Sequence, residues 1–475
     1  MSMLPHTARA AARRRPFDRL ERRLVKLMLK EGDLTVRPKV DELRYAISFA
    51  RLTEIRTEGS HDVDVAGPLA LHAQQLLDQL DRVIVKDKDL GAALRLGPQI
   101  LDRTRSARAS TLAHLPIPRS ALEDEVTTRQ LVIASGGGGG AGYVYPGAYD
   151  MIDRIGIEPA LLVGTSIGAL MAMFRARRRR FDLAALVAAA RALSWSNVFR
   201  VLETQNRYGI PATLRLYLRN ALGSLFMRDG EPMMLSDTEI PLYIVATGIT
   251  VDALKHDLNY YEQLLNQDLE GSRPFARTSG LKAIQVLREF LSRRDALVEV
   301  VLGRTPGTEH FDVIDGAGFS AAIPAVIHYD ILREDPRMTK LLDHLYGEFG
   351  ITRLGEGGMV SNVPARIAWE TATSGALGGR RNVFVVALDC FSPNISRIQW
   401  YPFQQLVRQS NVQTDIGFAD LYLPFPKTLS PLNLVPSLPE AMDAIRWGRE
   451  AIRPKLDFLK EMMKPLPVLR DPHDD

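Results

Sequence analysis

The short segment GTSIG at 164–168 has the residue types of a nucleophilic serine in a tight turn. The apolar run Leu161–Val163 precedes it, and small and apolar residues with a helical pattern follow as far as Phe174. Glycines two residues before and after a serine fit a sharp strand-to-helix turn, because a Cβ there would collide with neighbouring backbone. We therefore predict that Ser166 stands at the start of a helix, where unpaired N–H groups favour negative charge.

Upstream lies a run of five glycines at 136–140, which follows a short apolar segment typical of a buried strand. Residues without side chains allow several backbone N–H groups to converge on one oxygen anion. A phosphate loop has a similar composition, but the next residues, AGY at 141–143, lack the lysine and the hydroxyl that a P-loop needs. No acidic residue stands where a dinucleotide-binding fold requires one. The order strand, glycines, helix, strand, serine favours an oxyanion hole, formed by the N–H groups of Gly138, Gly139 and Ile167.

A nucleophilic serine also needs a base that accepts its proton. The histidines that follow the serine lack a catalytic sequence context, namely His256, His310, His328 and His344. A triad in the order serine, acid, histidine would use Asp389 and His473, but a histidine in the terminal tail is poorly placed for a base. A carboxylate that acts directly on Ser166 is the simpler alternative. The triad stays open as a second possibility, and it predicts that substituting a histidine abolishes activity.

The segment 137–170 resembles the opening of the patatin-like phospholipase family, in which a GxGxxG oxyanion loop precedes a GxSxG serine. In that family an aspartate in a DG[GA] motif completes a Ser–Asp dyad. Gly137, Gly139 and Gly142 match the loop, and Ser166 matches the serine. Three later segments are similar to family segments in the same order, namely PLYIVAT at 241–247, FSAAIP at 319–324 and GGMVSNVP at 357–364.

This resemblance implies a three-layer α/β/α sheet domain that hydrolyses a lipid acyl ester, either phospholipid or neutral glyceride, without a metal or another cofactor. The position of the dyad acid is occupied by Glu356. Asp315 also fits the DG[GA] motif, but it precedes the FSAAIP segment and is therefore the alternative acid. Two residues depart from the family pattern. Ala141 replaces a usual basic residue, and glutamate adds a methylene where a displacement of about 1 Å can cost on the order of 10²-fold in rate.

Two functions follow from these residues. The first is a serine lipid acyl hydrolase with Ser166 and Glu356 as its dyad. Its oxyanion hole is assigned to Gly137, Gly138, Gly139, Gly142 and Ile167. The alternative is a catalytically impaired patatin-like scaffold that binds lipid or a protein partner, because glutamate replaces the usual aspartate.

The elements that must position these groups follow from the hydrophobic periodicity. Residues 1–125 have apolar residues at helical spacing, for example in Phe17–Lys30, and predict a helical region. Residues 130–370 alternate between strands and helices, which is typical of a sheet covered on both faces, with a helical insertion at 251–296. Residues 371–475 are expected to supply the last core strand and a proline-rich, then helical, extension.

Composition limits the class of protein. The 475 residues carry a net charge of +4, which gives no support for a nucleic-acid partner. Cys390 is the only cysteine and fits a reducing, cytoplasmic location. Two arginine clusters (9–15 and 175–180) and the aromatic, proline-rich segment after Cys390 suggest either peripheral contact with a membrane or ordinary solvated and packed surfaces. The sequence does not indicate an oligomeric state.

Overall fold

The computed structural model describes residues 5–57, 61–201, 207–250, 256, 260, 296–392 and 412–470. The helical insertion predicted at 251–296 therefore lies almost entirely outside the described residues, as do Trp400, Tyr401, Phe403 and His473. The chain forms two compact units. The first contains residues 133–368 and 386–453, and the second contains residues 2–132, 369–385 and 454–475. These ranges differ from the predicted ones, since the C-terminal extension is divided between the two units.

A mixed sheet of seven strands forms the centre of the described fold, in the order β10-β9-β4-β3-β13-β14, with β12 paired to β9. β9 pairs in parallel with β4 and antiparallel with β10 and β12. The central strands are buried almost throughout, as expected for a sheet covered on both faces. The predicted three-layer α/β/α fold is thereby confirmed. The strands are β3 (Gln130–Ser135), β4 (Pro159–Thr165), β9 (Leu242–Thr250), β10 (Leu297–Leu302), β12 (Ile351–Gly355), β13 (Val383–Asp389) and β14 (Leu421–Pro424).

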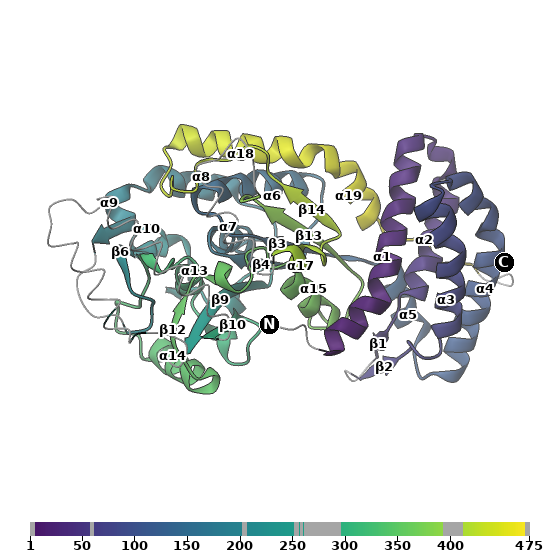
Figure 1. The fold of residues 1–475 in the computed structure, drawn as a ribbon, viewed down its shortest axis with the longest axis horizontal. Helices are drawn as coiled ribbons and strands as arrows, with labels where there is room; N and C mark the ends of the chain where they lie inside the picture. The colour runs from purple at the N-terminus through teal and green to yellow at the C-terminus, as the bar shows by residue number, and fades with distance from the viewer. Residues whose placement is uncertain are drawn as a thin grey trace. The chain divides into compact units, whose positions relative to one another are not determined.

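Helices of the first unit cover this sheet (Figure 1). Small or apolar residues occupy nearly every side of α7, and all but one of its residues are buried. α18 packs on α6, where Gly147 and Gly448 allow close approach: a Cβ at Gly448 would lie 1.9 Å from the Val144 carbonyl oxygen. The principal helices are α6 (Tyr145–Arg154), α7 (Ile167–Ala176), α8 (Leu183–Ala192), α9 (Trp195–Val198), α10 (Leu218–Leu222), α13 (Val313–Ser320), α14 (Pro336–Phe349), α15 (Ala365–Thr373), α17 (Val412–Ile416) and α18 (Leu438–Ile452).

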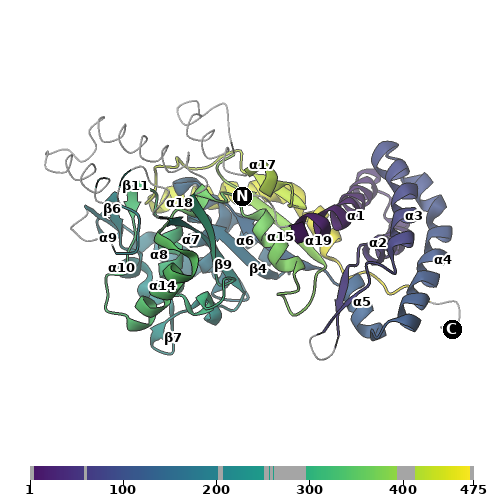
Figure 2. The same cartoon turned by 60° about the horizontal axis from the view of Figure 1, so that its bottom comes forward.

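A smaller, three-stranded sheet lies in the same unit. It consists of β5 (Phe199–Val201), β6 (Ala212–Leu216) and β11 (Ala325–His328), in the order β11-β6-β5. Figure 2 shows β6 and β11 side by side, and they pair in parallel, whereas β5 pairs antiparallel with β6. A short hairpin, β7 (Met227–Arg228) and β8 (Glu231–Pro232), follows β6.

The second unit is mainly helical, as the periodicity of residues 1–125 predicts. In α1 the apolar residues at helical spacing, Leu20, Leu24 and Met28, are fully buried. The hairpin β1 (Glu54–Arg56) and β2 (Asp62–Asp64) interrupts the helices. The helices are α1 (Pro5–Glu31), α2 (Arg37–Ala50), α3 (Ala70–Leu80), α4 (Leu90–His114), α5 (Arg119–Thr127) and α19 (Leu456–Met463).

Glu21 forms the centre of a buried polar network in this second unit. Its carboxylate accepts hydrogen bonds from Arg44 at 3.1 Å, Arg51 at 3.1 Å and Arg129 at 2.5 Å. The amide oxygen of Asn382 accepts from Arg51 and Arg129. Burial alone would raise the pKa of Glu21, but the three guanidinium groups lower it to about 2. The network thus joins α1 and α2 to residues outside the predicted range 1–125.

Among the described residues, no helix combines the length and the apolar character that crossing a membrane requires.

Candidate active site

Ser166 occupies the turn between β4 and α7 with backbone angles of φ +55° and ψ −127°. A non-glycine residue in this region costs about 1–3 kcal/mol, and such strain is concentrated at functional sites. The flanking glycines make the turn possible. A Cβ at Gly164 would lie 2.5 Å from the Cα of Ala169, and one at Gly168 would lie 2.1 Å from the carbonyl oxygen of Ser135. The strand-to-helix turn inferred from the GxSxG pattern is therefore present.

Ser320 fixes the backbone of this turn. The N–H of Ser166 donates to the Ser320 hydroxyl oxygen at 2.8 Å, and this hydroxyl donates to the carbonyl oxygen of Val245 at 2.6 Å. Ser320 is completely buried at the end of α13. It was not predicted from the sequence, although it lies within the FSAAIP segment that supported the family resemblance. The turn is thereby tied to the neighbouring strand β9.

Glu356 follows β12 directly, and its backbone is held on both sides. Its N–H donates to the carbonyl oxygen of Ala322 at 2.9 Å, and its carbonyl oxygen accepts from the Thr247 hydroxyl at 2.7 Å. In the side chain, Oε1 accepts from the N–H of Gly358 at 3.2 Å. The strand end and these bonds determine where the carboxylate lies.

Ser166 and Glu356 border the same small space. A Cβ built on Gly137 would lie 3.2 Å from the Ser166 Cβ and 3.6 Å from Oε1 of Glu356, so only glycine leaves this space open. Within the described residues, Oε2 of Glu356 has no hydrogen-bond partner. The Ser166 hydroxyl is near enough to the Glu356 carboxyl to lower its pKa.

The carboxyl group of Glu356 has a strongly perturbed pKa. Burial raises it from 4.5 to about 7, although the Gly358 N–H and the Ser166 hydroxyl each lower it. A general base works best when its pKa lies near the operating pH. The surroundings of Glu356 therefore give a carboxyl group the proton affinity that a base at neutral pH requires.

The alternative acid, Asp315, is already engaged by other side chains. Its carboxylate accepts from the Tyr329 hydroxyl at 2.6 Å and from Arg333 at 2.8 Å, and Arg219 lies 3.3 Å away. Asp315 is fully buried within this ionic cluster, which also contains Asp312. These contacts assign Asp315 to the packing of α13.

The glycine loop leaves selected N–H groups free to bind an anion. The N–H of Gly137 donates to the carbonyl oxygen of Asn362 at 2.9 Å, so the assignment of Gly137 as an oxyanion donor requires correction. Among the described residues, the N–H groups of Gly138, Gly139 and Ile167 donate no hydrogen bond. Gly142 contributes space instead, because a Cβ there would lie 2.5 Å from Cγ2 of Ile167.

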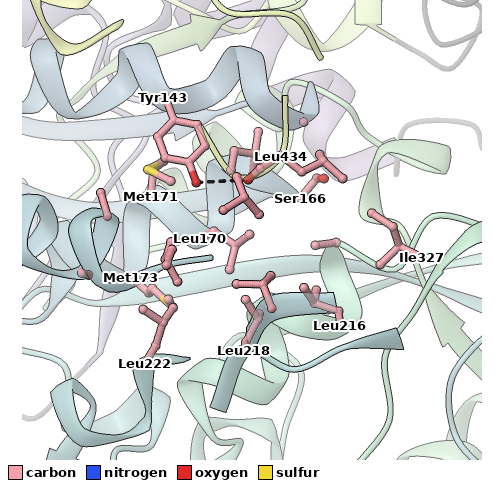
Figure 3. Close-up of a pocket in the computed structure, with 18 of the residues that line it drawn as sticks. Tyr143, Ser166, Leu170, Met171, Met173, Leu216, Leu218, Leu222, Ile327 and Leu434 are labelled. Carbon is pink, nitrogen blue, oxygen red and sulfur yellow. Dashed lines mark hydrogen bonds between the residues drawn. The ribbon is translucent and has the colours of Figure 1, made fainter. Parts of the chain in front are cut away.

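An apolar pocket begins at Ser166 (Figure 3). It contains about 830 Å³ of non-atom space, including its opening to solvent. Tyr143 is the other polar side chain in the wall, and its hydroxyl donates to the Leu434 carbonyl oxygen at 3.2 Å. No charged side chain of the described residues lines this pocket, whose walls include Leu170, Met173, Leu216, Leu218 and Leu222.

In the described part of the chain, no histidine and no cluster of metal-binding side chains forms part of the site around Ser166. His256, His310 and His344 are exposed, and His328 is buried with Nδ1 at 2.8 Å from the Ile210 carbonyl oxygen. Asp389, the acid considered for a triad, accepts from the Tyr422 hydroxyl at 2.7 Å. The described residues contain no cluster of three or more metal-binding side chains.

The arginine cluster at the end of α7 pairs mainly with acidic residues. Arg177 pairs with Asp182 at 2.6 Å, and Arg179 pairs with Glu158 at 2.8 Å. Arg175, although nearly fully buried, pairs with Asp153 at 3.4 Å. These pairs favour the structural interpretation of this cluster over contact with anionic lipid.

A comparison with known protein families matches part of the chain. The family model described as patatin-like phospholipase matches residues 133–369. This range contains the glycine loop, Ser166, Asp315 and Glu356. A search of curated proteins gives no match.

Proposed function

Because residues 133–369 belong to the patatin-like phospholipase family, whose members in general hydrolyse lipid esters, we propose that this protein is a serine lipid acyl hydrolase. Ser166 is the nucleophile and Glu356 is the base of its dyad. The observation that carries the proposal is that a buried carboxyl with a pKa near 7 borders the same small space as a strained serine at an apolar pocket. The specific substrate and the dyad go beyond what family membership establishes.

The proposed reaction begins when the Glu356 carboxylate takes the proton of the Ser166 hydroxyl. The serine oxygen attacks the ester carbonyl carbon, and the negative charge passes to the carbonyl oxygen. The N–H groups of Gly138, Gly139 and Ile167 bind this oxyanion, and loss of one such donor typically costs about 3 kcal/mol of barrier. Protonated Glu356 then gives its proton to the leaving alcohol. Water, deprotonated by the same carboxylate, attacks the acyl-serine, and Glu356 gives this proton to the Ser166 oxygen as the acid is released.

The pocket supports binding of an acyl chain whose ester carbonyl Ser166 attacks. Its wall contains methyl and methylene groups along most of its surface, and burial of each CH₂ contributes about 0.8 kcal/mol. In Figure 3, Leu218 and Leu222 lie across the pocket from Ser166. A chain that extends from the ester carbonyl toward these leucines would be removed from water.

An impaired scaffold that binds lipid or a partner is the second candidate. The specific observation in its favour is that Oε2 of Glu356 has no hydrogen-bond partner among the described residues. The longer side chain could hold the carboxyl away from the best position for proton transfer. Measured turnover separates the two candidates.

The proposal predicts that reactivity of Ser166 increases with pH around neutrality. Glu356 must be deprotonated to act as a base, and burial raises its pKa from 4.5 to about 7. We expect labelling by a fluorophosphonate probe to be slow at pH 5.5 and to reach a plateau above pH 8, with a midpoint near 7. The measurement is the labelling rate from pH 5 to 9 in buffers of constant ionic strength. A rate that does not change over this range would contradict Glu356 as the base.

The pocket predicts a change in acyl-chain preference when its far end is filled. Leu222→Trp should reduce hydrolysis of a C16 p-nitrophenyl ester by about tenfold or more, while hydrolysis of the C4 ester stays within about twofold. The ratio of the two kcat/KM values checks this expectation. Leu71→Trp is a matched control, because Leu71 is 69% exposed on α3 and is not part of the pocket. Equal losses on both esters in Leu222→Trp would indicate general damage to the fold.

A further inference from the structure

Residues 361 and 362 connect the two parts of the candidate active site. The carbonyl oxygen of Ser361 accepts a hydrogen bond from the Thr165 hydroxyl at 2.9 Å. The carbonyl oxygen of Asn362 accepts one from the Gly137 N–H, also at 2.9 Å. Thr165 ends β4 directly before the serine turn, and Gly137 belongs to the glycine loop. Two consecutive carbonyl groups therefore form a bridge between the serine turn and the oxyanion loop.

This bridge is packed tightly against the glycine loop. A Cβ at Gly136 would lie 2.9 Å from the Asn362 carbonyl oxygen, and one at Gly137 would lie 2.7 Å from Oδ1 of the same residue. Ser361 and Thr165 are completely buried. In a close-packed interior, a shift of one group displaces the groups that it contacts. The distance between the serine turn and the oxyanion loop consequently depends on where the bridge is held.

Asp415 holds the bridge from outside the range that the family model matches. Its Oδ2 accepts a hydrogen bond from the Ser361 hydroxyl, and its Oδ1 accepts one from Nε of Arg366 at 3.1 Å. Arg366 also pairs with Glu299 on β10. Asp415 is completely buried on α17, which follows the matched residues 133–369. One carboxylate oxygen is thus bonded to the bridge, and the other is bonded to a guanidinium that has a second carboxylate partner.

We propose that Asp415 is a positioning residue of the active site, which acts through Ser361 to set the distance between Ser166 and the oxyanion loop. Hydrogen bonds to an ionised acceptor are stronger than neutral ones, which suits a contact that must hold a position. A displacement of about 1 Å near the chemistry can cost on the order of 10²-fold in rate. The effect on turnover rests on the proposed hydrolase function, whereas the effect on the glycine loop does not.

Hydrogen exchange in the glycine loop tests the bridge without requiring turnover. In Ser361→Ala and in Asp415→Ala, the exchange rate of the Gly137 amide should rise by about tenfold or more, because the carbonyl that accepts from it is held less firmly. The rate is measured on the full chain at pH 7 by NMR or by mass spectrometry of the loop peptide. Unchanged exchange in both variants would overturn the proposal.

Ser48→Ala provides the matched control for the loss of a buried hydroxyl. Ser48 is 1% exposed in the second unit, and its hydroxyl donates to the carbonyl oxygen of Val126 at 2.7 Å. Exchange in the glycine loop of this variant should equal that of the wild type. A rise as large as in Ser361→Ala would assign the effect to a general loss of stability and would count against the bridge.

Turnover per active serine tests the positioning role itself. Active serines are counted by fluorophosphonate labelling to completion, so that unfolded protein does not contribute. Assays at pH 8 keep both carboxyl groups mostly ionised, because burial raises the pKa of Asp415 to about 6 and that of Glu356 to about 7. Ser361→Ala and Asp415→Ala should each lower kcat by about tenfold, and the double variant should lose no more than either one, since both break the same link.

Asp415→Asn distinguishes the hydrogen bond from the charge. Asparagine keeps a partner for the Ser361 hydroxyl, so kcat should stay within about threefold of the wild type. Additive losses in the double variant, or equal losses in Asp415→Asn and Asp415→Ala, would overturn the link through Ser361. An inactive wild type would contradict the proposed hydrolase function, and the exchange of the Gly137 amide would still decide whether Asp415 positions the loop.

Discussion

Ser166→Ala is expected to lower kcat/KM for p-nitrophenyl esters by at least about 10⁴-fold and to abolish labelling by a fluorophosphonate probe. The substitution removes the oxygen that forms the acyl intermediate, and the remaining oxyanion donors supply only residual catalysis. The change leaves the glycine-bounded turn intact and adds no volume, so the melting temperature should not fall. Alanine at position 166 keeps the positive φ of +55°, so the substitution does not relieve the backbone strain either.

Ser106→Ala provides the control for this experiment. Ser106 is exposed on α4, and its hydroxyl donates only to the carbonyl oxygen of Asp102 one turn earlier in the same helix. Its activity and labelling should equal those of the wild type. If Ser166→Ala retained wild-type turnover, Ser166 would not be the nucleophile, and the observed hydrolysis would come from another group.

Glu356→Gln is expected to reduce turnover by on the order of 10³-fold or more. Glutamine has the same shape, but its amide cannot accept the serine proton at any pH between 5 and 9. Glu356→Asp keeps the base but moves its carboxyl group back by about one methylene from its place after β12, so we expect a loss on the order of 10²-fold. Steady-state kinetics on one ester for the three proteins test this order.

A gain of turnover in Glu356→Asp would contradict the hydrolase assignment for the natural sequence. It would mean that aspartate restores a geometry that glutamate has lost. The scaffold alternative would then apply, particularly if the wild type and Ser166→Ala were equally inactive. The comparison of Glu356→Gln with Glu356→Asp therefore tests both the role of the acid and the reason for its identity.

The same Glu356→Gln protein should be more stable than the wild type at alkaline pH. Folding raises the carboxyl pKa from 4.5 to about 7, so this group favours the folded state below pH 4.5, and its contribution is lost as the pH rises through 7. The rise corresponds to on the order of 3 kcal/mol. In thermal unfolding at pH 5 and pH 8.5, the melting temperature of the variant should exceed that of the wild type only at pH 8.5. This opposite effect on stability and activity would distinguish a functional carboxyl from a structural one.

The sequence was most informative where local patterns determine the structure. Apolar segments at 131–134, 161–163 and 383–388 correspond to β3, β4 and β13, because buried central strands leave continuous apolar runs. The turn at Ser166 was predictable since glycine spacing alone limits its backbone. The order of the motifs placed Glu356 after a strand, although only the fold could bring it beside Ser166.

Long-range contacts were beyond the sequence patterns. The Gly137 N–H was assigned to the oxyanion hole, but it bonds to the Asn362 carbonyl, a residue more than 200 positions away. The hydrogen bond from the Ser166 N–H to Ser320 likewise joins a turn and a helix that lie 154 positions apart in the sequence. A family motif marks such segments without indicating which atoms meet.

The way the helical unit is assembled limits how the gene can be divided or recombined. A fragment ending at residue 125 would keep Glu21, Arg44 and Arg51 but would lose Arg129 and Asn382, which complete their hydrogen bonds in the full chain. The severed piece would therefore carry charged groups that must return to water. A transplanted copy of these N-terminal helices would need to extend to Arg129 and to include the segment around Asn382 to keep its buried hydrogen bonds.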